Sequence, residues 1–287
     1  MKFRVAGLAA LAVAAAPPAL AVCDIDIDQR AERAAEYVPQ ARACLAAPPR
    51  GFWFDGEQER QIFDLVNEER RKAGLPALAL RPELADAARF HALDLAVNEY
   101  FEHDGLDGRS PADRIALLDR RLIVEVSREN LASFQGPFDI SQSASILHRN
   151  LMDSPGHRKN ILAEDVDHAA MGLVLTRRGA WVTQLFVKEA GELNADLPPV
   201  LRPGALFPMQ ADLATWSFDS FQLGREAAAA RFETQEREIV PRAPTAPPGE
   251  ARLHVRGMLP TEEPRRFRVI ELPGPAVTIV ATGTGGS

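Results

Sequence analysis

The sequence contains little of what several common protein classes require. Only two of its 287 residues are cysteine, Cys23 and Cys44, which excludes a cysteine-rich zinc site and a scaffold stapled by many disulfides. Acidic residues outnumber lysine and arginine by 40 to 33, and the net charge of −7 argues against nucleic acid or anionic lipid as a partner. The chain contains no Gly-rich phosphate loop, no dinucleotide fingerprint, no His-Glu-x-x-His and no Gly-x-Ser-x-Gly.

Long apolar runs are also lacking, except near the N-terminus. Lys2 and Arg4 precede an apolar stretch at residues 5–16, and Ala19-Leu20-Ala21 places small residues where a signal peptidase cleaves. The stretch is shorter than the ~20 residues of a spanning helix, and no later one approaches that length. We therefore predict a signal peptide at residues 1–21, a secreted or periplasmic protein, and no transmembrane segment after signal removal.

The cysteines fit an exported protein. Val22 precedes Cys23, where a lipoprotein signal requires a small residue, which favours a soluble protein over a lipid-anchored one. Export permits a structural disulfide between Cys23 and Cys44. No further cysteine is left to act as a nucleophile.

Proline-rich breaks divide the rest of the chain. Pro48-Pro49 ends an N-terminal segment, Pro198-Pro199 follows the middle portion, and residues 241–249 have the composition of an extended linker. We expect an N-terminal helical segment at 22–50, a domain at 51–195, and a C-terminal extension at 196–287 that contains the proline linker and a small β module. Strands are expected at 253–259, 267–272 and 277–280.

The middle domain alternates helical and strand patterns. Asp55 and Gly74 bound one predicted helix, Pro82 begins a second, Ser110-Pro111 a third, and Asp139 caps a fourth. Residues 122–126 form a predicted strand, and 171–175 with 181–187 a predicted hairpin. This order predicts an α+β domain with a mainly antiparallel sheet. His91 is expected to be a core histidine with one hydrogen bond, and Arg120-Arg121 to lie in a solvated loop.

Several blocks of this domain resemble the CAP superfamily, also called SCP or PR-1-like, in a bacterial secreted form. The matching blocks are Val66-Asn67-Glu68-Glu69-Arg70, Tyr100-Phe101-Glu102-His103, Glu129-Asn130-Leu131-Ala132, residues 154–162 (Ser-Pro-Gly-His-Arg-Lys-Asn-Ile-Leu), Met171-Gly172 and residues 181–186. They cover about residues 56–188, and their order and spacing are more specific than any one block. The resemblance implies a three-layer α-β-α sandwich.

The resemblance also implies a cleft with two histidines and two glutamates. His103, Glu129 and His157 match three of these residues, and Asn130 and Ser154 lie beside them. The second glutamate has no counterpart, because residues 151–154 carry only Asp153 as a carboxylate. We therefore expect a triad rather than a tetrad.

Two readings of this triad stay open. His103 and His157 supply two ligands for a divalent cation such as Zn²⁺, and catalytic zinc usually has three protein ligands, so binding is expected to be weak and no cofactor to be required. Alternatively, the three side chains hydrogen-bond one another and tie a helix to a loop.

Three functions are compatible with these residues. The leading hypothesis is a non-enzymatic module that binds a lipid, a sterol or another apolar ligand, or an envelope partner, where only the resemblance implies lipids and sterols. The alternative is a peptidase-like or metal-assisted hydrolase that uses His103, Glu129 and His157. The third is a cell-wall or regulatory protein whose contact surface lies in residues 196–287. No catalytic residue is assigned on the leading hypothesis.

Overall fold

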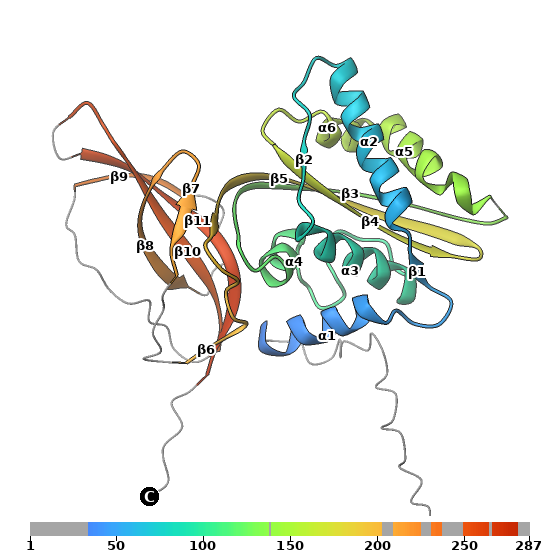
Figure 1. The fold of residues 1–287 in the computed structure, drawn as a ribbon, viewed down its shortest axis with the longest axis horizontal. Helices are drawn as coiled ribbons and strands as arrows, with labels where there is room; N and C mark the ends of the chain where they lie inside the picture. Colours follow the sequence, from blue (N-terminus) through green and yellow to red (C-terminus); the bar gives the residue numbers. More distant parts are fainter. Residues whose placement is uncertain are drawn as a thin grey trace, which may run out of the picture.

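The structure, a computed structural model, describes residues 34–137, 139–202, 209–224, 231–236, 249–263 and 266–280 (Figure 1). The helices are α1 (Ala34–Ala46), α2 (Gly56–Lys72), α3 (Leu84–Val97), α4 (Pro111–Leu118), the 3-10 turn η2 (Ile140–Gln142), α5 (Ser143–Asp153) and α6 (Pro155–Ile161). The strands are β1 (Trp53–Phe54), β2 (Ala79–Leu80), β3 (Leu122–Gln135), β4 (His168–Thr176), β5 (Gly179–Leu193), β6 (Val200–Leu201), β7 (Ala211–Leu213), β8 (Ser217–Gly224), β9 (Arg231–Glu236), β10 (Gly249–Pro260) and β11 (Arg266–Ile279).

Two of the predicted helix starts show the expected caps. The Asp55 side chain accepts a hydrogen bond from the Gln58 backbone N–H at 3.0 Å, which supplies one of the orphan donors of α2. Ser110 and Asp113 form a reciprocal capping box, and Pro111 follows as the first residue of α4. Asp139 caps η2 rather than α5 directly.

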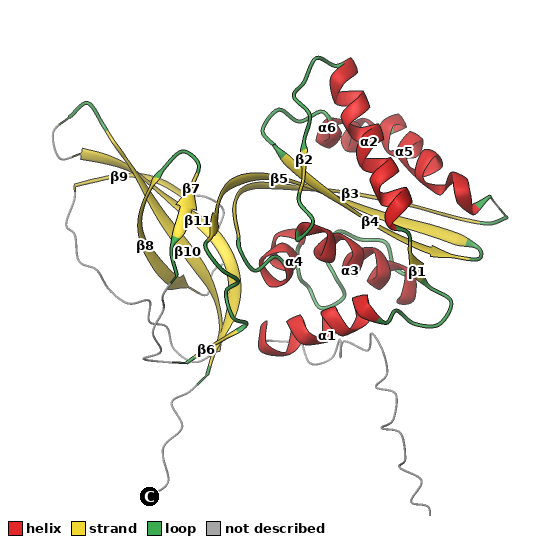
Figure 2. Ribbon diagram, in the orientation of Figure 1, coloured by secondary structure: helices red, strands yellow, loops and turns green. Residues whose placement is uncertain are grey.

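A mixed sheet of strand order β1-β4-β5-β3 forms the middle layer, with β2 parallel to β4 and every pair along this path antiparallel. Helices α2, α5 and α6 lie on one face, and α3 and α4 on the other (Figure 2). The predicted α+β sandwich is confirmed. Strand β3 continues past the predicted end at residue 126, which places Glu129 and Asn130 within an edge strand.

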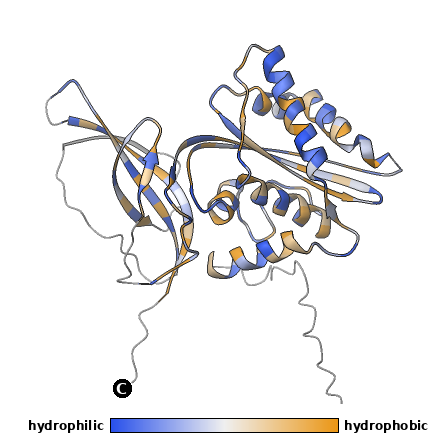
Figure 3. Cartoon of the chain, in the orientation of Figure 1, coloured by the Kyte–Doolittle hydropathy of each residue, from blue (hydrophilic) through white to orange (hydrophobic). Residues whose placement is uncertain are grey.

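Helix α1 adds a further tier outside α3 and α4. As a result α3 is covered by the sheet on one side and by α1 on the other, and its residues are largely hydrophobic (Figure 3). Helix α2 has one solvated side, and its residues are largely hydrophilic. Helix α3 also approaches the sheet closely. A Cβ on Gly172 would lie 2.2 Å from the backbone carbonyl carbon of Ala88, so only glycine fits at this position of β4.

The C-terminal β module predicted from the sequence is present. Its sheet has the order β6-β11-β10-β8, and β9 pairs with β11. The segments expected as two strands, 267–272 and 277–280, fall almost entirely within the single long strand β11. The last residues of β5 pair with β7, which belongs to the central sheet and contacts β8 of the second sheet. A hydrophobic cluster that includes Ile123, Leu193, Leu213 and Leu272 joins elements of the two sheets.

The end of the β10–β11 hairpin packs on α1 and α4 (Figure 1). The Glu250 carboxylate accepts a hydrogen bond from the Ala34 N–H at 2.8 Å, and Thr278 Oγ1 accepts one from the Ala35 N–H at 3.0 Å. Arg252 Nη2 lies 2.6 Å from Asp113 Oδ1 in α4. These contacts join the C-terminal module to the helical layer.

The prediction of a solvated loop at Arg120-Arg121 is wrong for Arg120. This side chain is 4% exposed and donates to the carbonyl oxygens of Leu197, Ala116 and Leu117. Arg121 is half-buried and pairs with Glu192 at 2.8 Å. Both arginines therefore tie the end of α4 to the segment where the two sheets meet.

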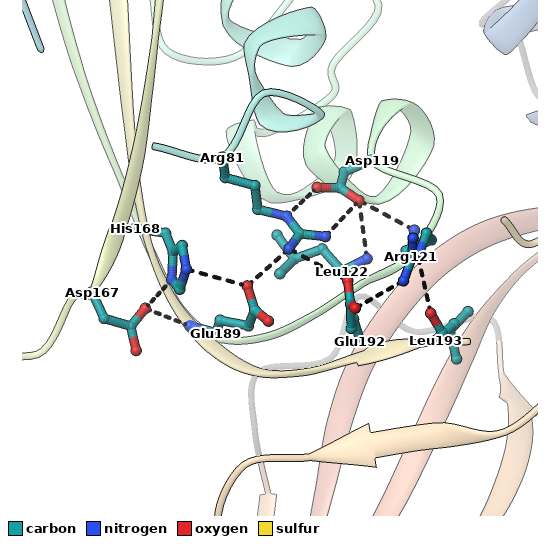
Figure 4. A network of polar contacts seen from close by, with 9 residues as sticks. All are labelled: Arg81, Asp119, Arg121, Leu122, Asp167, His168, Glu189, Glu192 and Leu193. Atoms are coloured by element: carbon teal, nitrogen blue, oxygen red, sulfur yellow. Dashed lines mark hydrogen bonds and ion pairs between the residues drawn. The ribbon is translucent and has the colours of Figure 1, made fainter. Parts of the chain in front are cut away.

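The neighbouring Arg81 is the centre of a polar network at this junction (Figure 4). Its guanidinium contacts Asp119 at 2.6 Å and Glu189 at 2.8 Å, and His168 lies 3.7 Å from the same Glu189 carboxylate. Since Glu189 is on β5, the network fixes this strand just before the residues that pair with β7.

Some predictions concern residues outside the described ranges. The signal peptide at 1–21, Cys23 and residues 241–248 of the linker are among them, so the disulfide stays a prediction; Cys44 is buried in α1. Of the N-terminal helical segment expected at 22–50, the structure describes α1. Among the described helices, none combines the length and apolar character needed to cross a membrane.

Candidate functional site

The predicted His103 and Glu129 side chains meet. His103, on the loop between α3 and α4, places Nδ1 2.8 Å from Oε1 of Glu129 on β3. The carboxylate is buried, with 2% of the Glu129 side chain exposed, whereas 55% of the His103 side chain is exposed. Because Nδ1–H donates to the carboxylate, Nε2 is the free nitrogen of the ring. The hydrogen bond to Glu129 raises the pKa of His103.

Arg114 in α4 completes this pair, and the sequence analysis did not select it. Its Nη2 donates to Glu129 Oε2 at 2.7 Å and to the His103 carbonyl oxygen at 2.9 Å, and Nη1 donates to the Arg109 carbonyl oxygen at 2.8 Å. Arg114 is 2% exposed. One buried guanidinium thus neutralises Glu129 and holds the His103 loop at two points.

His91 lies beneath the pair and is fully buried, as predicted. Its Nε2 donates to the carbonyl oxygen of Glu102 at 3.0 Å, next to His103, and lies 3.9 Å from Glu129 Oε1. Nδ1 has no hydrogen-bond partner among the described residues. Burial, with a contribution from Arg114, lowers the pKa of His91 to about 2, so His91 is neutral and supports the loop.

His157 is held by the next residue of β3. The Asn130 side chain donates to the His157 carbonyl oxygen at 3.0 Å and to Gln184 Oε1 at 3.1 Å. Asn160 in α6 donates to Asn130 Oδ1 at 2.9 Å and to the Glu129 carbonyl oxygen at 3.1 Å. Burial and the neighbouring His103 charge lower the pKa of the half-buried His157.

The alternation of side chains along a strand explains this arrangement. Glu129 pairs with Leu185, which packs with the α3 side, and Asn130 pairs with Gln184, whose neighbours Val182 and Phe186 pack on the α2–α5 side. The two histidines therefore reach the β3 edge from opposite faces of the sheet. We call His103, Glu129 and His157, with Arg114 and Asn130, the histidine site.

Two predicted residues take no part in the hydrogen bonds and ion pairs described above. Asp153, the last residue of α5, is exposed, and Ser154 lies between α5 and α6 without a capping hydrogen bond from its side chain. Their involvement in the site stays a prediction.

Two exposed apolar side chains lie close to His103 in the sequence. Phe101 and Leu106 are each 47% exposed, and they are two of the four exposed large apolar residues in the described chain. A pocket with about 310 Å³ of empty space, part of it open solvent, lies beside Leu106 and is lined also by Tyr37, Phe90, Asp94, Gly105, Asp107 and Arg114.

The geometry can support two kinds of chemistry. His103 has the hydrogen-bonded orientation of a general base, with a buried carboxylate on one nitrogen and the other nitrogen free. Weak cation binding by the same free nitrogen and the His157 ring is the second, and it stays a prediction. Within the described ranges, no group of three or more His, Cys, Asp or Glu residues is placed to hold a metal ion.

Sequence reasoning missed Arg114, Asn160 and Gln184. For Arg114 a signal existed, since it lies four residues before Leu118 on an apolar face of a short helix, where an unpaired charge would be costly. Asn160 and Gln184 lay inside the blocks that carry the family resemblance, but nothing in their spacing showed that they meet Asn130.

Comparisons with known proteins agree with these observations. The sequence profile of the CAP family, described as the Cysteine-rich secretory protein family, matches residues 63–186. The protein YkwD of Bacillus subtilis is 30% identical over 129 residues, which cover 45% of this chain and 46% of that protein. The membrane protein YlbC of the same organism is 29% identical over 140 residues, 45% of this chain and 34% of that one. The chain thus spans less than half the length of these relatives.

Two solved structures are similar to part of this chain. An extracellular SCP-domain protein from Bacillus anthracis is 30% identical with a TM-score of 0.40, covering 47% of this chain and 41% of that one. An outer surface protein from Borrelia burgdorferi is 23% identical with a TM-score of 0.39, covering 46% of this chain and 93% of that one.

Proposed function

Because this chain contains a CAP domain, we propose that it is an exported, non-enzymatic binding protein whose histidine site takes an apolar ligand of the lipid or sterol class. The observation that supports this proposal best is the exposure of Phe101 and Leu106 on either side of His103. Export rests on the charged, apolar and small-residue pattern of residues 1–21.

The rigidity of the loop favours binding over incidental exposure. Exposed apolar side chains on a mobile loop are common and carry little meaning. Here His91 and Arg114 hold the loop by the carbonyl oxygens of Glu102, His103 and Arg109. Phe101 and Leu106 are therefore presented in a fixed arrangement, which lowers the entropy cost of binding an apolar ligand.

Polar groups next to the apolar ones fit a ligand with a polar end. The free nitrogen of His103 accepts a hydrogen bond when neutral and donates one when charged, so it can bind a hydroxyl or a carboxylate. A fatty acid or a sterol combines such a group with an apolar body.

The test is binding of the fluorescent fatty acid cis-parinaric acid to the purified mature protein. We expect saturable binding that weakens at least about tenfold in F101S and L106S, since each change removes roughly 1.5–3 kcal/mol of apolar burial. F218S is the matched control, because Phe218 is 38% exposed but lies on β8 in the C-terminal module. No saturable binding, or an equal loss in F218S, would refute the proposal.

Weak divalent-cation binding belongs to the same proposal. His103 and His157 are the two proposed ligands, and a site with two protein ligands is open and binds a cation with low affinity. Calorimetric titration with Zn²⁺ should show weak binding that disappears in both H103A and H157A. Tight binding, or binding that persists in both variants, would contradict a two-histidine site.

A hydrolase is the second candidate, and one observation favours it. The hydrogen bond between His103 Nδ1 and Glu129, with Arg114 behind the carboxylate, is the base-and-orienting-carboxylate arrangement used to activate water or a hydroxyl. Turnover of a panel of p-nitrophenyl esters and peptides would support it if H103A abolished the activity while the far-ultraviolet circular dichroism stayed unchanged. Activity that persists in the double variant H103A/H157A would exclude this candidate.

A further inference from the structure

The β10–β11 hairpin contacts the helix that carries Arg114. Arg252 of β10 is 7% exposed, and its Nη2 lies 2.6 Å from Asp113 Oδ1. The other Asp113 oxygen accepts hydrogen bonds from the Ser110 N–H at 3.1 Å and the Ser110 hydroxyl at 2.7 Å. Asp113 therefore uses one oxygen to cap α4 and the other to bind the C-terminal module.

The next residue of α4 holds the histidine site. Arg114 follows Asp113 directly and contacts Glu129, the His103 carbonyl and the Arg109 carbonyl at 2.7–2.9 Å. Both residues lie in the first turn of α4, so a displacement of this turn moves the guanidinium as well. Hydrogen bonds of this length weaken steeply when their donors move or tilt.

The hairpin reaches the same loop by a second path. Glu250 and Thr278 accept hydrogen bonds from the first two described amides of α1. On that helix the Tyr37 ring lies 4.7 Å from the Arg109 guanidinium carbon, a cation–π contact. Arg109 lies near the end of the loop that carries His103. The β10–β11 hairpin thus holds both α1 and α4, and each of these helices contacts the loop that carries His103.

We propose that the C-terminal β module positions the histidine site, with Arg252 as the positioning residue that acts through Asp113 and Arg114. On this view the module forms part of the binding unit, and a partner that displaced the hairpin would loosen the site. This inference rests on the proposed function for the role of the site, but its test requires no ligand.

The test compares three variants of the full mature chain by hydrogen exchange. R252A removes the ion pair, R252K keeps a cation, and R256A is the matched control, because Arg256 lies four residues along the same strand and pairs with Asp219 inside the module at 3.4 Å. The reporters are amides with known hydrogen bonds in the loop and α4, such as Gly105 to Arg109 and Arg114 to Ser110.

We expect these amides to exchange at least about tenfold faster in R252A, because the half-buried Asp113 loses its counter-ion and the first turn of α4 loses its contact with β10. R252K should restore rates close to those of the unchanged protein, and R256A should leave them unaltered. A spectroscopic signature should accompany the change: the His103 ring proton resonance, recorded at one pH where the ring is neutral, should shift in R252A and not in R256A.

Two outcomes would overturn the proposal. Unchanged loop amides in R252A would show that the ion pair does not position the site. Equal acceleration in R252A and R256A would show a general loosening of the module. If R252A does not fold, D113N replaces it, since asparagine keeps the side-chain acceptor of the cap while losing the charge that pairs with Arg252. Amide exchange is measured without ligand, so a failure to bind fatty acid does not change its result, and the failure of either proposal is recognisable separately.

Discussion

Replacing Glu129 with glutamine should destabilise the protein strongly, although it only exchanges one carboxylate oxygen for an NH₂ group. The carboxylate is buried and contacts Arg114 at 2.7 Å and His103 at 2.8 Å. Glutamine offers one acceptor oxygen and turns an NH₂ group towards the second donor. The Arg114 guanidinium, 3% exposed, is then left as a buried charge without a counter-ion.

Breaking one side of a buried ion pair typically costs about 3–5 kcal/mol. We expect about 3 kcal/mol for E129Q, because the glutamine oxygen keeps one hydrogen bond. With a urea m value of about 3 kcal/mol/M, this loss lowers the unfolding midpoint by about 1 M. Urea unfolding followed by circular dichroism measures it directly.

The same strand provides the control. Glu125 pairs with Lys188 at 3.0 Å, and both side chains are partly exposed, at 24% and 42%. Since exposed pairs contribute about 0–1 kcal/mol, E125Q should hardly move the midpoint. In addition, E129Q/R114M should be less destabilised than the sum of the two single variants, because it leaves no unpaired charge. Equal midpoints for E129Q and E125Q would refute the assignment of a buried pair.

Two further predictions concern His91 and Gly172. The folded-state pKa of His91 is lowered to about 2, so below pH ~6.5 the unfolded state takes up a proton that the folded state does not, and stability falls as the pH falls towards 2. Between pH 6 and pH 5 the free energy of unfolding should fall by about 1.2 kcal/mol. The fall should be absent in H91Q, where the amide can still donate to the Glu102 carbonyl. Urea unfolding at both pH values measures it, and the same dependence of stability on pH in H91Q would contradict the prediction. G172A should cost about 1–3 kcal/mol or more by pushing α3 from β4, whereas G156A, with no atom within 4 Å of its added Cβ, should be near neutral in thermal unfolding.

Local signals made much of the fold predictable. Asp55 and Ser110 are the N-cap residues of α2 and α4, and apolar periodicity indicated α2, α3 and the β4–β5 hairpin. The continuation of β3 past residue 126 was not predictable in this way, because its polar residues at 127–130 lack a strand pattern. They stay in the strand because β5 pairs with them and because Glu129 and Asn130 find partners on the two faces of the sheet.

The candidate site was predictable only where sequence blocks marked it. The hydrogen bond between His103 and Glu129 is one of those expected within the triad, and the part of His157 stays a prediction. The dependence of this bond on Arg114 arises from tertiary packing, which brings α4 against β3. The burial of Arg120 has the same origin, since its acceptors at Leu197 and Pro198 lie far along the chain. Partners separated by many residues leave no periodicity in a single sequence.

The contact between α1 and the β10–β11 hairpin also determines when the native structure can be completed. The Ala34 amide and its Glu250 acceptor are 216 residues apart, and the Ala35 amide and Thr278 are 243 residues apart. Such distant partners meet late, because the long intervening chain must be ordered or closed first. During synthesis, Asp113 lacks its Arg252 counter-ion until β10 has emerged. A chain cut between residues 194 and 248 would contain every residue of the histidine site and still lack the contacts of Glu250, Arg252 and Thr278 that complete its support.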